Sequence, residues 1–168
     1  MSNKEIISQW FHEYSNDVYS FLVYYTGSTD VEDLVQEVFI KALKGLSTFK
    51  KEAQPKTWLI RIARNVAIDE SRKRKSRAHH YSVPIHEWQE QGHELTPELM
   101  VDQQETKATL YQMIQSLKSN DRDVLILRGI KQLSVAETAT ILKWTESKVR
   151  STYHRALQKL RKLQGGIQ

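Results

Sequence analysis

Apolar side chains recur every three or four residues through most of the first half of this sequence, and this spacing is the strongest constraint on its fold. One series runs through residues 7–25 and is followed by Gly27, which can end a helix. It predicts one long helix or a broken helix pair. A second series, in residues 31–46, predicts another amphipathic helix with Asp30 as its N-cap. No segment alternates as a strand would, so we expect an all-α fold.

The polar side of the second predicted helix carries a distinctive set of residues. Asp33, Gln36, Glu37 and Ile40 fall at positions i, i+3, i+4 and i+7, so they share one face opposite the apolar stripe. Acidic and amide groups beside an exposed isoleucine indicate a ridge that docks on a partner. The alternative is an ordinary solvated helix face with one stray apolar residue.

A third helix is predicted to start near Thr57, after a loop in residues 47–56. Trp58 and its aliphatic neighbours are expected to pack inward, and Trp58 fits a core position better than a stacking platform. The outer side is basic and polar, which suits a phosphate backbone. The candidate DNA-binding residues on this helix are Arg61, Arg64, Asn65, Arg72 and Lys73.

Charge alternates along the 168-residue chain. Residues 1–44 hold three Lys or Arg against seven Asp or Glu, and residues 61–77 hold seven against two. Residues 78–106 hold six acids and no Lys or Arg, whereas residues 143–162 hold seven bases and one acid. Two basic blocks separated by an acidic stretch indicate two contacts with a polyanion, although each could be only a solvated face.

The acidic stretch contains two prolines and a glycine and has little periodicity, so it is interpreted as a flexible linker. The sequence therefore predicts two small helical domains, residues 1–77 and 106–168, joined by residues 78–105.

The second domain has the pattern of a helix-turn-helix motif. Support helices are expected in residues 110–130, with Asn120 or Asp121 capping the second one. Ser134 and Glu137 have the spacing of a capping box, so a helix should begin there. A turn in residues 143–145 then leads into a further amphipathic helix.

In a helix-turn-helix motif the second helix enters the major groove, and residues in its amino-terminal half face the bases. Arginine can bind guanine with two hydrogen bonds, a hydroxyl can contact several bases, and other cations can hold phosphates. The alternative is a basic amphipathic helix within a bundle, and Lys143 stands where the turn usually has glycine. The candidate duplex-binding residues are Lys148, Arg150, Ser151, His154 and Arg155.

Composition excludes several classes of protein. The chain has no cysteine, so it has neither disulfides nor a thiolate zinc site. No apolar run reaches the roughly 18 residues of a membrane-spanning helix, and no secretory signal is visible, so we expect a cytoplasmic protein without membrane insertion. Histidines 79, 80, 86 and 93 lie in the predicted linker, where nothing pairs them with a nucleophile or ligand set. We expect no metal, no cofactor and no enzymatic activity.

Three segments in order, residues 30–39, 57–69 and 147–156, resemble the sigma-70 family, specifically its small extracytoplasmic function group. The resemblance covers roughly residues 8–77 and 106–163. It implies a bacterial transcription initiation factor with a region 2 helical bundle and a region 4 helix-turn-helix domain. It also implies a role in stress response.

The resemblance gives each candidate surface a partner. Asp33, Gln36 and Glu37 match the region that docks on the clamp coiled coil of core RNA polymerase, and Ile40 could extend that contact. The basic helix, with Asn65 as the best pocket candidate, matches the part that binds the melted strand of the −10 element. The predicted helix in the second domain matches the reader of the −35 duplex, and the linker matches a segment that enters polymerase channels. Family members are often held inactive by an anti-sigma factor.

The main alternative is an autonomous helix-turn-helix regulator that binds operator DNA without polymerase. Such a regulator needs neither the acidic ridge nor a strand-capturing domain. An RNA-binding adaptor is a third possibility, but the sequence has no aromatic sheet motif to support it.

Overall fold

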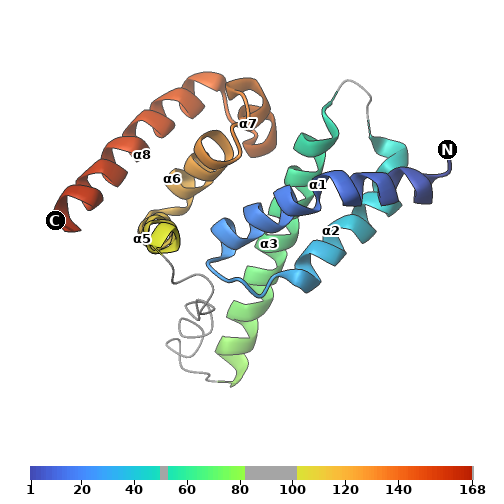
Figure 1. Cartoon of the computed structure of the whole chain (residues 1–168), viewed down its shortest axis with the longest axis horizontal. Coiled ribbons are helices and arrows are strands. Elements are labelled where there is room, and N and C mark those ends of the chain that lie inside the picture. Colours follow the sequence, from blue (N-terminus) through green and yellow to red (C-terminus); the bar gives the residue numbers. More distant parts are fainter. Residues whose placement is uncertain (50–52, 82–101, 168) are drawn as a thin grey trace. The chain divides into compact units, whose positions relative to one another are not determined.

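The computed structural model describes residues 1–49, 53–81 and 102–167, and helices make up nearly all of this part of the chain (Figure 1). The chain divides into two compact units, Met1–Glu94 and Leu95–Gln168. No strand occurs in the described ranges. The predicted fold of two all-helical domains is confirmed, whereas most of the predicted linker lies outside the described residues.

Helix α1, Asn3–Thr26, is one continuous helix, which settles the choice between one helix and a broken pair. Its N-cap is Ser2, whose hydroxyl accepts a hydrogen bond from the Glu5 amide at 3.2 Å. Gly27 ends it in the left-handed conformation, with φ of 78°, as its position in the sequence predicted.

Helix α2, Glu32–Gly45, starts after Val31, so the prediction that Asp30 caps it is wrong. Val31 is only 1% exposed, and its carbonyl accepts the Val35 amide at 2.9 Å. Burial of Val31 in the core therefore fixes where α2 begins. The Asp30 amide instead donates to the Ser28 hydroxyl at 3.0 Å, in the turn before the helix.

Helix α3, Pro55–Tyr81, begins two residues before the predicted start at Thr57. Proline suits the first turn of a helix because its fixed φ is helical and because an N–H at that position would have no partner within the helix. A short 3₁₀ turn, η1 (Leu46–Thr48), occupies the start of the predicted loop. At its other end α3 continues past residue 77, where the sequence placed the end of the first domain.

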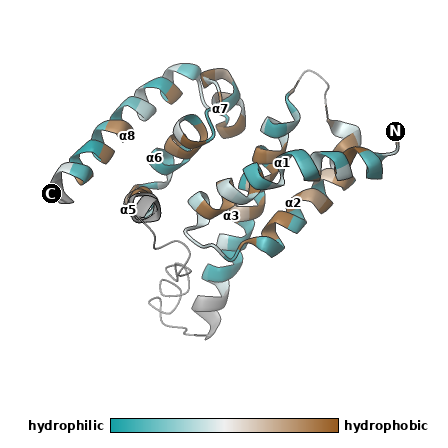
Figure 2. Ribbon diagram, viewed as in Figure 1, coloured by the Kyte–Doolittle hydropathy of each residue, from teal (hydrophilic) through white to brown (hydrophobic). Residues whose placement is uncertain are grey.

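The three helices of the first unit pack against one another in every pairing. Figure 2 shows hydrophobic bands on α1, α2 and α3 alternating with hydrophilic ones. Each large side chain buried this way stabilises the fold by about 1.5–3 kcal/mol. The fully buried core side chains include Val18, Phe21, Leu22, Val38, Ala42, Leu59, Ile60 and Ala63.

An aromatic cluster lies beside this core. The ring of Trp10 is 5.1 Å from Phe49 and 6.0 Å from Trp58, and the Phe49 and Trp58 rings are 5.2 Å apart, measured between centroids. Trp58 is half-buried in this cluster, which fits the predicted packing role. The cluster joins α1 and α3 to the residue that follows η1.

The second unit begins with α5, Asp102–Ser116, followed by α6, Ser119–Val124, and a π-helical turn, η3, Leu125–Ile130. Lys118 precedes α6 and no side chain caps it, so the prediction of a cap at Asn120 or Asp121 is wrong. Asp121 lies in the first turn instead. Its buried carboxylate accepts a 2.6 Å hydrogen bond from the Lys159 ammonium. This contact ties α6 to the last helix.

The helix-turn-helix motif consists of α7, Val135–Leu142, and α8, Glu146–Ile167. The capping box at Ser134 and Glu137 is confirmed, with hydrogen bonds of 3.0 and 3.1 Å. Lys143 adopts the left-handed conformation, with φ of 59°, where many such turns have glycine. The core of this unit includes Ile114, Val124, Leu125, Ile126, Leu127, Ile141, Val149 and Ala156.

Candidate nucleic-acid interfaces

The predicted ridge on α2 is present as an outward face of the first unit. Asp33 and Gln36 are exposed, Glu37 is half-buried, and Ile40 is 53% exposed. Ile40 is thus open to water beside two carboxylates, whereas the apolar residues on the other side of the same helix are buried. The face therefore offers an apolar contact surrounded by acidic and amide groups.

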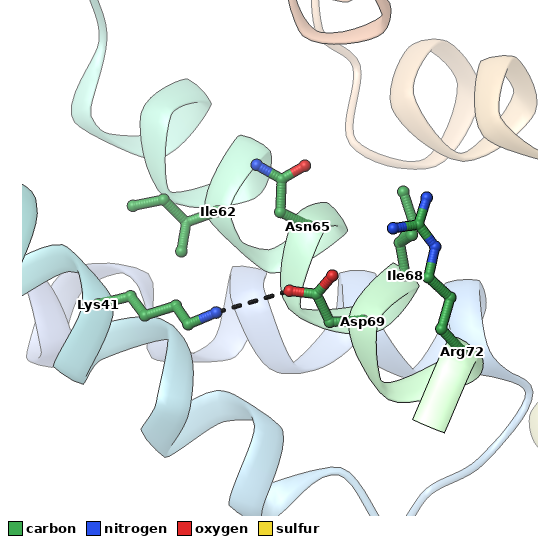
Figure 3. Close-up of a pocket in the computed structure, with 6 residues that line it drawn as sticks. All are labelled: Lys41, Ile62, Asn65, Ile68, Asp69 and Arg72. Carbon is green, nitrogen blue, oxygen red and sulfur yellow. Dashed lines mark ion pairs between the residues drawn. The ribbon is translucent and has the colours of Figure 1, made fainter. Parts of the chain in front are cut away.

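Beside this face, α2 and α3 enclose an open pocket of about 520 Å³ (Figure 3). Figure 3 shows Lys41 extending from α2 toward Asp69 on α3, and the two charges are 3.7 Å apart. The Lys41 ammonium also lies 3.6 Å from Glu37. The lining residues are Lys41, Ile62, Asn65, Ile68, Asp69 and Arg72.

The pocket combines the groups needed to hold a planar polar molecule attached to an anion. The Asn65 amide can both donate and accept hydrogen bonds, which suits the edge of a nucleobase. Ile62 and Ile68 supply apolar contact, and Arg72 supplies a cation for a phosphate. Pairing with Lys41 offsets the negative charge of Asp69 at the same site.

Not every predicted residue of α3 lines this pocket. Asn65 and Arg72 do, whereas Arg61, Arg64 and Lys73 do not. Arg61 and Lys73 are exposed, so they remain open to a phosphate backbone outside the pocket. Arg64 is half-buried, so less of its guanidinium is available to a ligand than its place in the sequence predicted.

All five predicted duplex-binding residues on α8 are exposed. Lys148, Ser151 and Arg155 form one row along the helix, with the Ser151 hydroxyl 3.4 Å from the Lys148 carbonyl and Arg155 Nε 3.4 Å from the Ser151 carbonyl. Arg150 and His154 form a neighbouring row one turn apart. The opposite side of α8 is buried at Val149, Thr152 and Ala156, so the cationic side necessarily faces outward.

The structure adds three residues that sequence reasoning missed. Lys41 and Asp69 belong to different helices, and only the packing of α2 against α3 brings them together. Trp144, in the turn of the helix-turn-helix motif, lies under Lys148, with Nζ 4.2 Å from the ring centroid. Because Trp144 precedes α8, which begins at Glu146, helical spacing gave no signal for that contact.

The described ranges contain no group of three His, Asp or Glu side chains able to hold a metal ion. The side chains of histidines 79, 80, 86 and 93 lie outside the described part. None of the helices described has the length and apolar character needed to span a bilayer.

Comparison with protein families gives two matches that follow the two units. The model of sigma-70 region 2 matches residues 10–77, and that of sigma-70 region 4 matches residues 107–160. The first match contains α2 and most of α3, and the second contains the helix-turn-helix motif.

Individual relatives match over nearly the whole chain. The ECF RNA polymerase sigma factor SigX of Bacillus subtilis is 36% identical over 163 residues, covering 95% of this chain and 84% of the relative. The RNA polymerase sigma factor YlaC of the same organism is 32% identical, covering 96% and 94%. The ECF RNA polymerase sigma-E factor of Escherichia coli K12 is 34% identical, covering 85% and 78%.

Solved structures show the same fold. The sigma factor RpoE of Bartonella quintana, in complex with the anti-sigma factor NepR, superposes with a TM-score of 0.79 at 23% identity, covering 94% of this chain and 96% of that one. CnrH, in complex with the cytosolic domain of CnrY, gives a TM-score of 0.69 at 20% identity, covering 97% and 90%.

Proposed function

This chain is an RNA polymerase sigma factor of the extracytoplasmic function group of the sigma-70 family, and we propose that its two helical units divide promoter recognition between them. The first unit binds core polymerase and the opened −10 strand. The second unit reads the −35 element as intact duplex. The domain limits predicted from the sequence, 1–77 and 106–168, remain our proposal for these two parts.

The proposed polymerase contact is the α2 ridge of Asp33, Gln36, Glu37 and Ile40. Its support is the exposure of Ile40 on a helix whose other side is fully packed. An apolar side chain surrounded by carboxylates suits a partner helix that presents basic residues around an apolar spot.

The proposed site for the melted strand is the pocket between α2 and α3. Asn65 would hydrogen-bond an unstacked base, and Arg72 would hold the adjoining phosphate. Arg61, Arg64 and Lys73 would follow the strand outside the pocket. Extruding a base costs a few kcal/mol, so binding the open strand shifts the melting equilibrium toward the open state.

The proposed −35 reader is the exposed side of α8, with Lys148, Arg150, Ser151, His154 and Arg155. Its support is a cationic face at the amino-terminal half of the second helix of a helix-turn-helix motif, where such proteins contact base edges. Two rows of side chains allow one row to contact bases while the other contacts phosphates.

On this proposal the chain catalyses no reaction and works in the cytoplasm beside polymerase. Promoter opening is driven by binding alone, so no cofactor is needed. We also propose an anti-sigma factor as a regulatory partner. Its support is that RpoE, which has the same fold, is solved in complex with the anti-sigma factor NepR, and that CnrH is solved in complex with the cytosolic domain of CnrY.

The observation that carries this proposal is the acidic, partly apolar α2 ridge, because an autonomous operator-binding regulator has no use for it. The test is the capture of purified bacterial core RNA polymerase by the full chain. Wild type should form a one-to-one complex, and Asp33→Lys should weaken it. Glu13→Lys, a matched charge reversal at an exposed site on α1, is the control and should bind as wild type does. Failure of the wild-type chain to bind core polymerase would overturn the proposal.

A further inference from the structure

The turn between α7 and α8 holds a tryptophan in a defined position. The Trp144 amide donates to the Ala139 carbonyl at 3.0 Å, so the backbone of the turn is tied to α7. The next residue, Thr145, accepts the Lys148 amide on its hydroxyl at 3.1 Å and the Val149 amide on its carbonyl at 3.1 Å. Trp144 is half-buried between these two fixed points.

One face of the Trp144 ring is covered by the ammonium group of Lys148. Nζ lies 4.2 Å from the ring centroid, well within the roughly 6 Å at which a cation is attracted to an aromatic face. Tryptophan is the side chain best suited to this interaction. Within the described part of the chain no carboxylate pairs with Lys148, so the ring is the described contact that acts on its charge.

This contact lowers the conformational entropy that Lys148 loses when it binds an anion. A free lysine has a flexible four-carbon stem, and fixing it on a ligand loses rotamer freedom. The ring already restricts the stem, so less freedom remains to be lost when the ammonium binds an anion. The ring leaves the outer side of the ammonium open, because Lys148 is exposed.

The chemistry of Lys148 points to a phosphate and not to a base. An ammonium is a compact point charge, whereas reading guanine with two hydrogen bonds needs the planar fork of an arginine such as Arg150. Lys148 also stands in the first turn of α8, nearer the motif's turn than Arg150 or His154. Lysine side chains and the N-termini of helices commonly contact phosphates in protein–DNA complexes, and Lys148 combines the two.

We propose that Trp144 is a positioning residue that holds the Lys148 ammonium ready for one phosphate of the duplex contacted by α8. The pair sets affinity without setting sequence preference. This inference rests on the proposed assignment of α8 to duplex DNA, and it assigns Trp144 a part in binding without contact with a base.

The test measures binding of reconstituted holoenzyme to a promoter fragment selected from a library by transcription, and to the same fragment with its upstream element scrambled. Lys148→Ala should weaken binding to both fragments by the same factor. The slope of log affinity against log salt should become shallower by about 0.9, the value for one phosphate contact. A loss confined to the selected fragment would reassign Lys148 to a base and overturn the proposal.

Trp144 is tested by a double-mutant cycle with Lys148. Trp144→Leu should weaken binding roughly two- to five-fold, the scale of an exposed cation–π contact, and should have no further effect when Lys148 is already alanine. Trp144→Phe, which keeps an aromatic face, should retain most of the affinity. An equal loss from Trp144→Leu in both backgrounds would show a merely structural role and contradict the inference.

Arg150→Ala separates failure of this inference from failure of the proposed function. If Arg150→Ala removes discrimination between the two fragments but Trp144 and Lys148 do not couple, only the positioning role is wrong. If Arg150→Ala and Lys148→Ala both leave binding to the two fragments unchanged, α8 does not contact the duplex, and both the inference and that part of the proposed function are wrong.

Discussion

Helices α2 and α8 are built alike but present opposite charges. Each buries one side against its own unit and leaves the other side open, with Val38 and Val149 both fully buried. The open side of α2 carries Asp33 and Glu37, whereas the open side of α8 carries lysine, arginine and histidine. Helical periodicity therefore creates an outward face in both places, and the residues on that face determine whether it suits a protein or a nucleic acid.

The two units also differ in what holds them together. The first relies on three long helices with a continuous apolar core and an aromatic cluster. The second includes the short elements α6, η3 and α7, and polar contacts hold them: the Asp121–Lys159 pair, the capping box at Ser134, and Arg128, which lies 5.3 Å over the Tyr153 ring. Changes to apolar packing should thus disturb the first unit most, and single polar changes should have measurable effects in the second.

The largest effect is expected in the core of the first unit. Phe21→Ala removes a fully buried ring, which should lower the free energy of unfolding of that unit by about 3–5 kcal/mol. Urea unfolding followed by circular dichroism measures this. Phe11→Ala, at a 43% exposed site on the same helix, is the control with a much smaller cost. Equal losses at the two sites would contradict the packing described for α1.

A smaller effect is expected at the tie between α6 and α8. Asp121→Ala removes a carboxylate that is 7% exposed and bonded to Lys159 at 2.6 Å. Hydrogen bonds to charged groups contribute about 1.5–3 kcal/mol, so the second unit should lose stability of that order. Thermal unfolding provides the measurement, and Asn120→Ala at the exposed neighbouring position should change little. A stable Asp121→Ala variant would show that the tie is incidental.

Promoter choice should depend on α8 and not on α2. Arg150→Ala should cost about 1–3 kcal/mol at its cognate base pair if its guanidinium makes two hydrogen bonds there. Binding of holoenzyme to fragments that vary one base pair at a time measures this. An equal loss on all sequences would assign Arg150 to a phosphate instead.

The smallest expected effect concerns the start of the helix-turn-helix motif. Ser134→Ala removes one half of the capping box and should destabilise the second unit by about 1 kcal/mol. Thr140→Ala, at an exposed site on the same helix, is the matched control. A shift in melting temperature for Thr140→Ala as large as that for Ser134→Ala would argue against the cap as the cause.

The sequence predicted features that depend on local rules. The apolar spacing of α2, the end of α1 at Gly27 and the capping box at Ser134 each follow from a few neighbouring residues, and all three are present. The predicted caps at Asp30 and at Asn120 or Asp121 are wrong, and tertiary contacts mark both places. Val31, beside Asp30, is buried in the core, and the Asp121 carboxylate is bonded to Lys159, far along the chain.

The candidate sites also divide into features set by local sequence and features set by tertiary packing. The exposed faces of α2 and α8 followed from helical spacing, so their residues could be named in advance. The pocket was only partly foreseen, because Asn65 and Arg72 lie on one helix, whereas Lys41 comes from another. The π-helical turn at Leu125–Ile130 has no signature in a single sequence, since tertiary packing sets it.

The most direct measurement of the division of labour is run-off transcription by core polymerase on a promoter library, with and without the full chain. The wild-type chain should create new start sites. Asp33→Lys should lower transcription from all of them by a similar factor, whereas Arg150→Ala should change which promoters are used. Identical start sites with and without the chain, or the same pattern of loss for both variants, would contradict the account.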